Sequence, residues 1–147
     1  MAPEAYEEGE IPLLRLIPLA NKIIGINEYT REYNLTKSQL LFMTALYYRG
    51  SLNMSGISEY ISSSKEQATR TVAPLVERGL VKRVSVPKNR TLVCIELTEH
   101  GKSVMDSICD ELRLELRPRL NNSLSPEEIA QLTESVRTTI ALLMKVK

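Results

Sequence analysis

The chain has 147 residues, of which 43% are hydrophobic and 25% charged, a composition typical of one globular domain that buries its own core. Nineteen lysines and arginines balance eighteen aspartates and glutamates, which excludes a polyacid or a histone-like polycation. Two cysteines and one histidine are too few for a disulfide scaffold or a four-ligand zinc site. Neither a membrane-spanning run nor a secretory leader is evident, so we expect a cytoplasmic protein without membrane contact, metal or cofactor.

Two helices are predicted in the first third of the chain. Apolar residues at helical spacing predict a helix over 11–33, and Pro18 is the position at which we expect it to kink or to begin. Thr36 followed by Gln39 is a capping-box pattern, which predicts a second helix over about 37–49.

A short helix, a turn and a longer helix follow. Asn53 is a suitable cap for the short helix, and a run of three serines interrupts it, because hydroxyl side chains compete for helical backbone bonds. Ser64 predicts the cap of the longer helix, with Gln67 completing a capping box and Gly79 ending the last turn. We expect Pro74 to bend that last turn. The buried side is predicted to comprise Ala68, Val72 and Leu75.

Beyond this helix the period changes to that of a strand. Two short β-branched runs, 80–86 and 92–97, flank a turn over 87–91 and predict a two-stranded hairpin.

Two long helices are predicted to complete the chain. Thr98 is the expected cap of the first, which should end before Pro118. Its inward residues are predicted to be Val104, Ile108 and Leu112. Ser125, followed by a proline and two glutamates, is a strong start for the second, which carries a long apolar stripe.

Positive charge is concentrated between Lys65 and Arg90. This stretch carries seven bases against Glu66 and Glu77, a net charge of +5 in a chain whose total is +1. Such a segment is typical of a protein that binds a polyanion, although a solvated charged face would explain the charge alone equally well. We expect solvated charge at two or more of Arg78, Lys82 and Arg83.

A short helix, a tight turn, a longer helix and a basic hairpin form the order of a winged helix-turn-helix. Its longer helix would enter the major groove, where Gln67 can bind adenine and Arg70 or Lys65 can bind guanine or phosphate. Arg90 suits a narrow minor groove and Lys88 a phosphate. The alternative is that these are ordinary surface residues. The candidate DNA-binding residues are Ser64, Lys65, Gln67, Thr69, Arg70, Lys88, Asn89 and Arg90.

Several of these stretches, in this order and spacing, resemble one family. They are Leu35-Thr36-Lys37-Ser38-Gln39, Thr69-Arg70 followed by Leu75, Gly79-Leu80-Val81-Lys82-Arg83, Pro87-Lys88-Asn89-Arg90 and Leu97-Thr98-Glu99-His100-Gly101. Together they make the segment 35–103 similar to the multiple-antibiotic-resistance regulator (MarR) family of bacterial transcription factors. The chain departs from the family pattern in its polar turn Ser62-Ser63-Ser64, in Asn89 where an aspartate is usual, and in Thr91 where a second arginine is usual.

The resemblance implies a mainly α fold with a small β-hairpin wing, in which a winged helix-turn-helix is flanked by N- and C-terminal dimerisation helices. We expect a single domain over 1–147, with the DNA-binding lobe at 35–100 and the dimerisation helices at 10–32 and 105–145. The implied function is a homodimeric repressor that binds a roughly palindromic operator in double-stranded DNA and responds to a small-molecule effector.

Three other functions are weighed on the residues alone. A winged-helix protein–protein module would explain the departures at Asn89 and Thr91. Thiol-based redox sensing would need an exposed thiolate, whereas we expect Cys94 and Cys109 to be buried. An enzyme is not expected, since no phosphate loop, metal-ligand cluster or activated nucleophile is present in the sequence.

The interfaces are predicted from apolar and aromatic residues. The candidate dimer interface comprises Ile17, Ile24, Ile129, Leu132, Val136 and Ile140, with an intramolecular helix bundle as the alternative. The candidate effector pocket comprises Tyr29, Tyr33, Phe42 and Tyr47, with ordinary core packing as the alternative. His100 is expected to lie at the surface.

Overall fold

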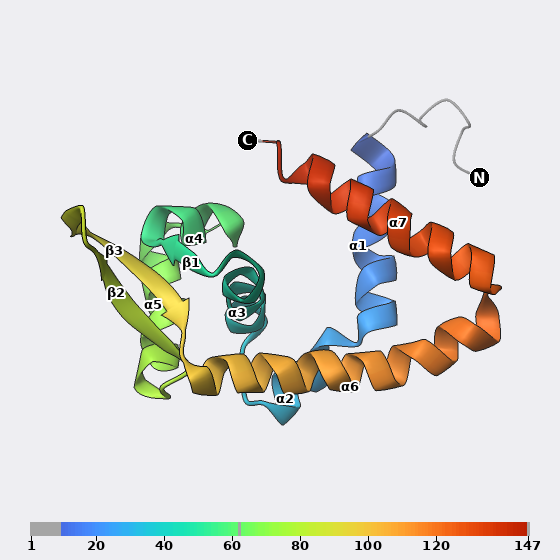
Figure 1. Cartoon of the computed structure of the whole chain (residues 1–147), viewed down its shortest axis with the longest axis horizontal. Coiled ribbons are helices and arrows are strands. Elements are labelled where there is room, and N and C mark those ends of the chain that lie inside the picture. Colours follow the sequence, from blue (N-terminus) through green and yellow to red (C-terminus); the bar gives the residue numbers. More distant parts are fainter. Residues whose placement is uncertain (1–9, 62, 147) are drawn as a thin grey trace. The chain divides into compact units, whose positions relative to one another are not determined.

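The computed structural model describes residues 10–61 and 63–146, of which residues 10–12 and 90 are described as backbone only. Within this part of the chain lie seven helices and three short strands (Figure 1). They are α1 (Glu10–Ile24), α2 (Ile26–Glu32), α3 (Lys37–Arg49), β1 (Ser51–Asn53), α4 (Met54–Tyr60), α5 (Lys65–Glu77), β2 (Val81–Val86), β3 (Asn89–Leu97), α6 (Glu99–Ser123) and α7 (Pro126–Leu143). The mainly helical fold with a small sheet confirms the predicted fold class.

The first predicted helix is two helices, and the break lies at Gly25 rather than at Pro18. Gly25 adopts φ 64°, a left-handed conformation that glycine tolerates and that ends α1. Pro18 lies inside α1 without ending it. The proline removes one helical bond, to the carbonyl of Leu14, and that residue is largely exposed, so water can satisfy the oxygen.

The caps of the central helices follow the local sequence. Thr36 and Gln39 form the predicted capping box at the start of α3. The side chain of Asn53 accepts a hydrogen bond of 2.8 Å from the backbone N–H of Gly56 and so caps α4. Ser64 caps α5, which continues past Pro74 to Glu77.

The sheet has three strands where the sequence predicts two. β1 pairs antiparallel with β3, through pairs such as Leu52 with Ile95, and the strand order is β1-β3-β2. The turn of the hairpin is only Pro87-Lys88, because β3 already begins at Asn89. β1 is not predicted from the sequence, because three residues are too few to show the alternation of a strand.

Of the last two helices, α6 is longer than predicted, and α7 begins where it was predicted to begin. α6 continues through Pro118 to Ser123, so the expectation that it ends before the proline is wrong. Pro118 is exposed, so the lost backbone bond can be replaced by water. α7 begins with a complete capping box between Ser125 and Glu128, as the sequence predicts.

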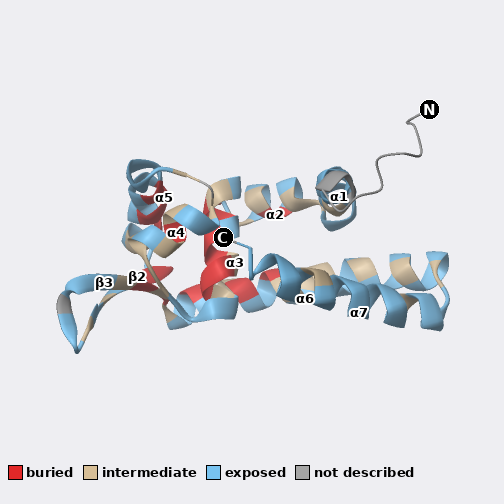
Figure 2. Ribbon diagram, turned by 90° about the horizontal axis from the view of Figure 1, so that it is seen from above, coloured by how far each residue is buried: buried red, intermediate tan, exposed pale blue. Residues whose placement is uncertain are grey.

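The core is built around α3. Phe42, Met43 and Leu46 of this helix are almost completely inaccessible, and they pack with buried residues of α4, α5, the sheet and the start of α6. Figure 2 shows buried residues in red on these elements, and none on α7 or on residues 13–24 of α1. The chain divides into two compact units, residues 1–109 and 110–147, with the boundary inside α6. Among the described residues, no helix is both long and apolar enough to cross a membrane.

Candidate nucleic-acid interface

Helix α5 separates its residues into a buried face and an exposed face. Its buried residues are Ala68, Thr71, Val72 and Leu75, which confirms the predicted inward side and adds Thr71. The residues predicted to contact DNA from this helix, Lys65, Gln67, Thr69 and Arg70, are all exposed. Because the helical period places these two sets on opposite sides, packing of the inner set presents the outer set to solvent.

The N-terminal turn of α5 is only partly capped as expected. The Ser64 hydroxyl accepts a hydrogen bond of 3.2 Å from the backbone N–H of Gln67. The reciprocal bond of a capping box is missing, and the Gln67 side chain bonds to none of the described residues. The Gln67 amide is therefore available for a base edge such as that of adenine.

Two cations of this helix form no salt bridge with the described residues. Neither Lys65 nor Arg70 pairs with an acid in the part of the chain that the structure describes. Thr69 lies between them and donates its hydroxyl proton to the carbonyl of Lys65 at 2.9 Å. The exposed face thus offers two positive charges and one free amide.

The same turn carries an acid that the predicted site omits. The pKa of the Glu66 carboxyl lies below its usual range, because its own backbone N–H and the Ser64 hydroxyl hydrogen-bond to the charged form. The backbone N–H of Glu66 is therefore already engaged by its own carboxylate. An acid in the first turn of a helix is favoured by the helix dipole, and this signal is visible in the sequence at Glu66.

In the wing, the two residues that depart from the family pattern bond to each other. The Asn89 side-chain oxygen accepts hydrogen bonds from the Thr91 backbone N–H at 3.2 Å and from the Thr91 hydroxyl at 2.6 Å. Lys88 is exposed in the turn. The side chain of Arg90 lies outside the described residues. The Asn89–Thr91 pair braces the backbone on both sides of Arg90 without an ionic contact.

Of the three bases after α5, two are solvated as expected and one is not. Lys82 and Arg83 are exposed and make no ion pair with the described residues. Arg78 instead donates two hydrogen bonds to backbone carbonyls at the end of α2.

This arrangement of helices and wing is shared with proteins of known family. A family model described as the MarR family matches residues 35–93. The multiple antibiotic resistance protein MarR of Escherichia coli (strain K12) is 26% identical over 124 residues, which cover 83% of this chain and 86% of that protein. A crystal structure of E. coli MarR, as a cysteine-to-serine mutant complexed with operator DNA, has a TM-score of 0.62 at 24% identity and covers 88% of this chain and 94% of that one.

The chain is similar to the MarR family, whose model matches its winged-helix segment. This similarity indicates a transcriptional regulator with a DNA-binding winged helix rather than an enzyme. The HTH-type transcriptional regulator YfiV of Bacillus subtilis (strain 168) is 29% identical over 122 residues, covering 83% of this chain and 76% of that protein. A crystal structure of NadR in complex with 4-hydroxyphenylacetate has a TM-score of 0.75 at 20% identity and covers 99% of both chains.

The aromatic residues predicted to line an effector pocket lie in different surroundings from one another. Phe42 is completely buried and Tyr29 nearly so, while Tyr33 is half-buried. Tyr47 lines a cavity of about 520 Å³ between the end of α3, the sheet and the first turns of α6. Of the four, therefore, Tyr47 has a clear place in a cavity.

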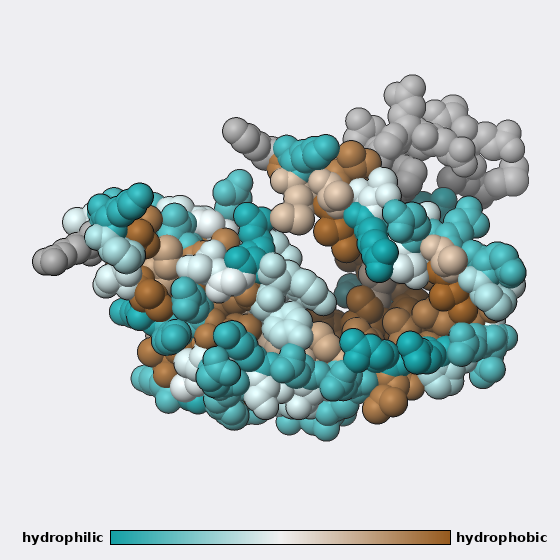
Figure 3. All heavy atoms as spheres, in the orientation of Figure 1, coloured by the Kyte–Doolittle hydropathy of each residue, from teal (hydrophilic) through white to brown (hydrophobic). Residues whose placement is uncertain are grey.

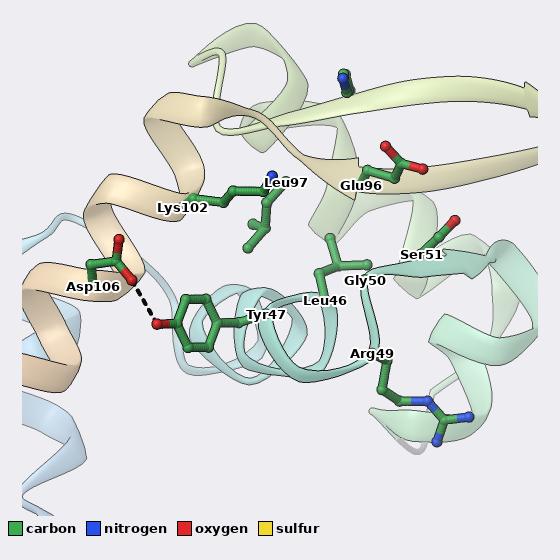
Figure 4. A pocket seen from close by; sticks show the side chains of 10 residues that line it. Leu46, Tyr47, Arg49, Gly50, Ser51, Glu96, Leu97, Lys102 and Asp106 are labelled. Carbon is green, nitrogen blue, oxygen red and sulfur yellow. Dashed lines mark hydrogen bonds between the residues drawn. The ribbon is translucent and has the colours of Figure 1, made fainter.

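The cavity combines an apolar floor with a charged rim (Figure 4). Leu46 and Leu97 contribute the floor, and Lys102 extends across the opening toward Leu97. The Tyr47 hydroxyl donates a hydrogen bond of 2.6 Å to Asp106, which raises the pKa of Tyr47 to about 12. The other charged lining residues are Arg49, Lys82 and Glu96.

The remaining candidate residues carry little chemistry. Cys94 and Cys109 are free thiols, and both are half-buried rather than buried as expected. His100 is exposed in the first turn of α6, which confirms its predicted surface position. Within the described residues, no group of three histidine, cysteine or acidic side chains could hold a metal ion.

Proposed function

We propose that this regulator is a homodimeric repressor that binds a roughly palindromic operator and changes its DNA affinity when a small organic acid binds. The observation that carries the DNA contact is the exposed face of α5, where Lys65, Gln67 and Arg70 form no side-chain hydrogen bond or salt bridge with another side chain among the described residues. In the major groove, Gln67 would bind adenine, and Arg70 guanine or phosphate. Lys88 at the wing turn would meet phosphate, and the Arg90 side chain a narrow minor groove.

Exposed apolar stripes on the flanking helices support the homodimer. On α1, Ile17 and Ile24 are 58% and 39% exposed, and Leu132, Val136 and Ile140 of α7 are between 41% and 53% exposed. Figure 3 shows apolar residues in brown at the surface of α7. Ile129 differs from the others, because it lines a small cavity with Leu116 and Leu120 of α6 in the same chain. A second copy presents the same stripes, so it is a partner of matching chemistry.

Selection of binding sites from a random pool of DNA duplexes tests the proposal and requires no known operator sequence. We expect an enriched motif with two related half-sites about one helical turn apart, the spacing of a dimer of helix-turn-helix units. Recovery of no motif by the purified wild-type chain, with and without ligand, would overturn sequence-specific binding.

Two substitutions then test the assigned contacts on the selected site. Arg70→Ala should cost roughly 1–3 kcal/mol of binding free energy and relax base preference at one position. Lys88→Ala should weaken binding to every sequence alike and reduce the salt slope by about 0.9, the value for one phosphate. Arg113→Ala, which removes an exposed arginine of α6, is the matched control. Equal affinities for all four proteins would refute the site.

The cavity beside Tyr47 is the proposed effector site. A volume of about 520 Å³ falls in the range of small-molecule sites. Lys102 has only an exposed ion pair with Glu99 at 3.3 Å, so a ligand carboxylate can take its place at little cost. The apolar body of such an acid would lie on Leu46 and Leu97.

4-Hydroxyphenylacetate, the compound bound to NadR, is the probe, with its neutral amide as the control ligand. We expect the acid to raise the melting temperature and to change operator affinity, and the amide to do neither. Lys102→Gln should abolish both effects, while Lys37→Gln, which changes an exposed lysine of α3 outside the cavity, should not. Identical responses of the two variants would remove the cavity from the proposal.

A further inference from the structure

The C-terminal end of helix α5 is held by a second helix through one side chain. α5 ends in a Schellman motif: Gly79 adopts φ 67°, its N–H bonds to Val76, and the N–H of Leu80 bonds to Leu75. Arg78 is the C-cap residue of this motif. Its backbone therefore belongs to the end of α5, while its long side chain can reach another segment.

The guanidinium caps the end of α2, which closes with the same motif. Asn34 adopts φ 50°, unusual for a residue other than glycine, and the N–H of Leu35 bonds to the carbonyl of Thr30. Arg78 Nη1 donates to the Asn34 carbonyl at 2.7 Å, and Nη2 donates to the Tyr33 carbonyl at 2.9 Å.

Charge and shape both suit this contact. The C-terminal end of a helix carries partial negative charge, which a cation stabilises. The planar fork of arginine can bond two adjacent carbonyls at once, whereas a lysine ammonium is a single point charge. The contact joins residues 44 and 45 positions apart in the sequence, so it ties two separate segments of the fold together.

A third segment also bonds to the end of α5. The Thr98 hydroxyl donates to the Gly79 carbonyl at 2.5 Å, and the Thr98 backbone N–H donates to the Leu80 carbonyl at 3.0 Å. Thr98 immediately precedes α6. The end of α5 is therefore fastened to α2 by Arg78 and to the start of α6 by Thr98.

We propose that Arg78 is a positioning residue for DNA recognition: it sets the orientation of α5 from the end of α2 and does not itself contact DNA. This inference rests on the proposed function of the exposed face of α5. Because α2 lies in the segment 10–32 proposed for dimerisation, the same contact carries the state of that segment to the DNA-reading helix.

Salt dependence separates a positioning residue from a phosphate contact. We expect Arg78→Ala to lower affinity for the selected operator about tenfold, the loss typical of one base contact, while the salt slope and the affinity for scrambled DNA stay unchanged. Arg78→Lys, which keeps the charge but not the fork, should behave like Arg78→Ala. Arg83→Ala, a nearby exposed arginine, is the matched control for loss of charge.

Two results would overturn the inference. A salt slope reduced by about 0.9, with an equal loss on scrambled DNA and rescue by Arg78→Lys, would make Arg78 a phosphate contact. Unchanged operator affinity of both variants would make it a surface residue without a role in binding. Circular dichroism at the assay temperature checks that each variant is folded. If Arg78→Ala is unfolded, Arg78→Lys alone tests the inference. Absence of an enriched motif with the wild type would fault the proposed function instead.

Discussion

Glu66 is the least expected residue of the exposed face of α5, because its side chain is negatively charged. It lies one residue from Lys65 and Gln67, and hydrogen bonds from its own N–H and from Ser64 lower the pKa of its carboxyl. A negative charge at this position repels DNA phosphates. On a DNA sequence that offers no base contacts, nothing offsets this repulsion. We therefore expect Glu66 to weaken binding to arbitrary sequences more than binding to the operator.

Glu66→Gln tests this effect. We expect the variant to bind scrambled DNA several-fold more tightly, because a repulsive charge is gone, and to discriminate less between operator and scrambled DNA. Anisotropy titrations at low and moderate salt measure both affinities. Glu77→Gln removes an exposed acid from the other end of the same helix and serves as control. An unchanged ratio of the two affinities in Glu66→Gln would contradict the argument.

Tyr47 provides a prediction on pH. Its hydrogen bond to Asp106 favours the neutral phenol and raises its pKa to about 12, against 10.0 in the unfolded chain. The bond therefore contributes to stability fully below pH 10 and is lost as the pH rises from 10 toward 12. Asp106→Asn should return the phenol toward its ordinary pKa. The tyrosinate absorbance of each protein, minus that of the corresponding Tyr47→Phe variant, measures this; equal curves would contradict it.

At the scale of elements, helix starts are predicted well and helix interruptions poorly. The caps at Thr36, Asn53, Ser64 and Ser125 depend on neighbours within three residues, so a local pattern contains the whole interaction. The interruptions depend on the surroundings. Pro18 and Pro118 are tolerated inside exposed helices, whereas Gly25 ends α1 through its backbone conformation.

Interactions between distant segments are the part that sequence patterns do not contain. β1 forms because it pairs with residues of β3 more than forty positions later. Nothing in the local sequence distinguishes Arg78 from the solvated bases Lys82 and Arg83. Arg78 differs only because the end of α2 lies within hydrogen-bond distance of its guanidinium in the folded chain. For the candidate site, the exposed face of α5 was therefore predictable, while the Arg78 contact and the cavity beside Tyr47 were not.

The close contact of Gly101 with Leu80 leads to a prediction about the hydrogen-bonded segment between the end of α5 and the start of α6. A β-carbon at this position would collide with the carbonyl oxygen of Leu80, which already accepts a hydrogen bond from Thr98. Gly101→Ala should lower the free energy of unfolding by about 1–3 kcal/mol, the usual cost of overpacking, and urea denaturation measures it. Gly56→Ala meets only ordinary contacts inside α4 and should be tolerated. Similar losses in both variants would refute the explanation.

At the scale of the whole molecule, burial is unevenly distributed between the two compact units. The buried residues lie in the unit that ends at Cys109, and α7 in the other unit has no buried residue. A helix gains most of its stability from packing an apolar face. The stripe of α7 therefore requires a partner, which we propose to be a second copy of the chain.

Val136→Asp combined with Ile140→Asp tests the dimer without disturbing contacts of Ile129 within the chain. We expect the double variant to sediment as a monomer at concentrations where the wild type is a dimer, and to lose operator binding. Thr138→Asp adds a charge on an exposed part of the same helix outside the stripe and should remain dimeric. A double variant that keeps the mass of a dimer would contradict the assignment.

Asn53 has a consequence for how the length of this chain can vary. It is the last residue of β1, paired with Cys94, and its side chain is also the cap of α4. Strand and helix thus meet with no connecting residue, and adding or removing one there would separate the pairing from the cap. The residues of the exposed turn Pro87-Lys88 only connect two strands and do not cap a helix. Among natural relatives, insertions and deletions should therefore gather at the wing turn and avoid the stretch from Leu52 to Gly56.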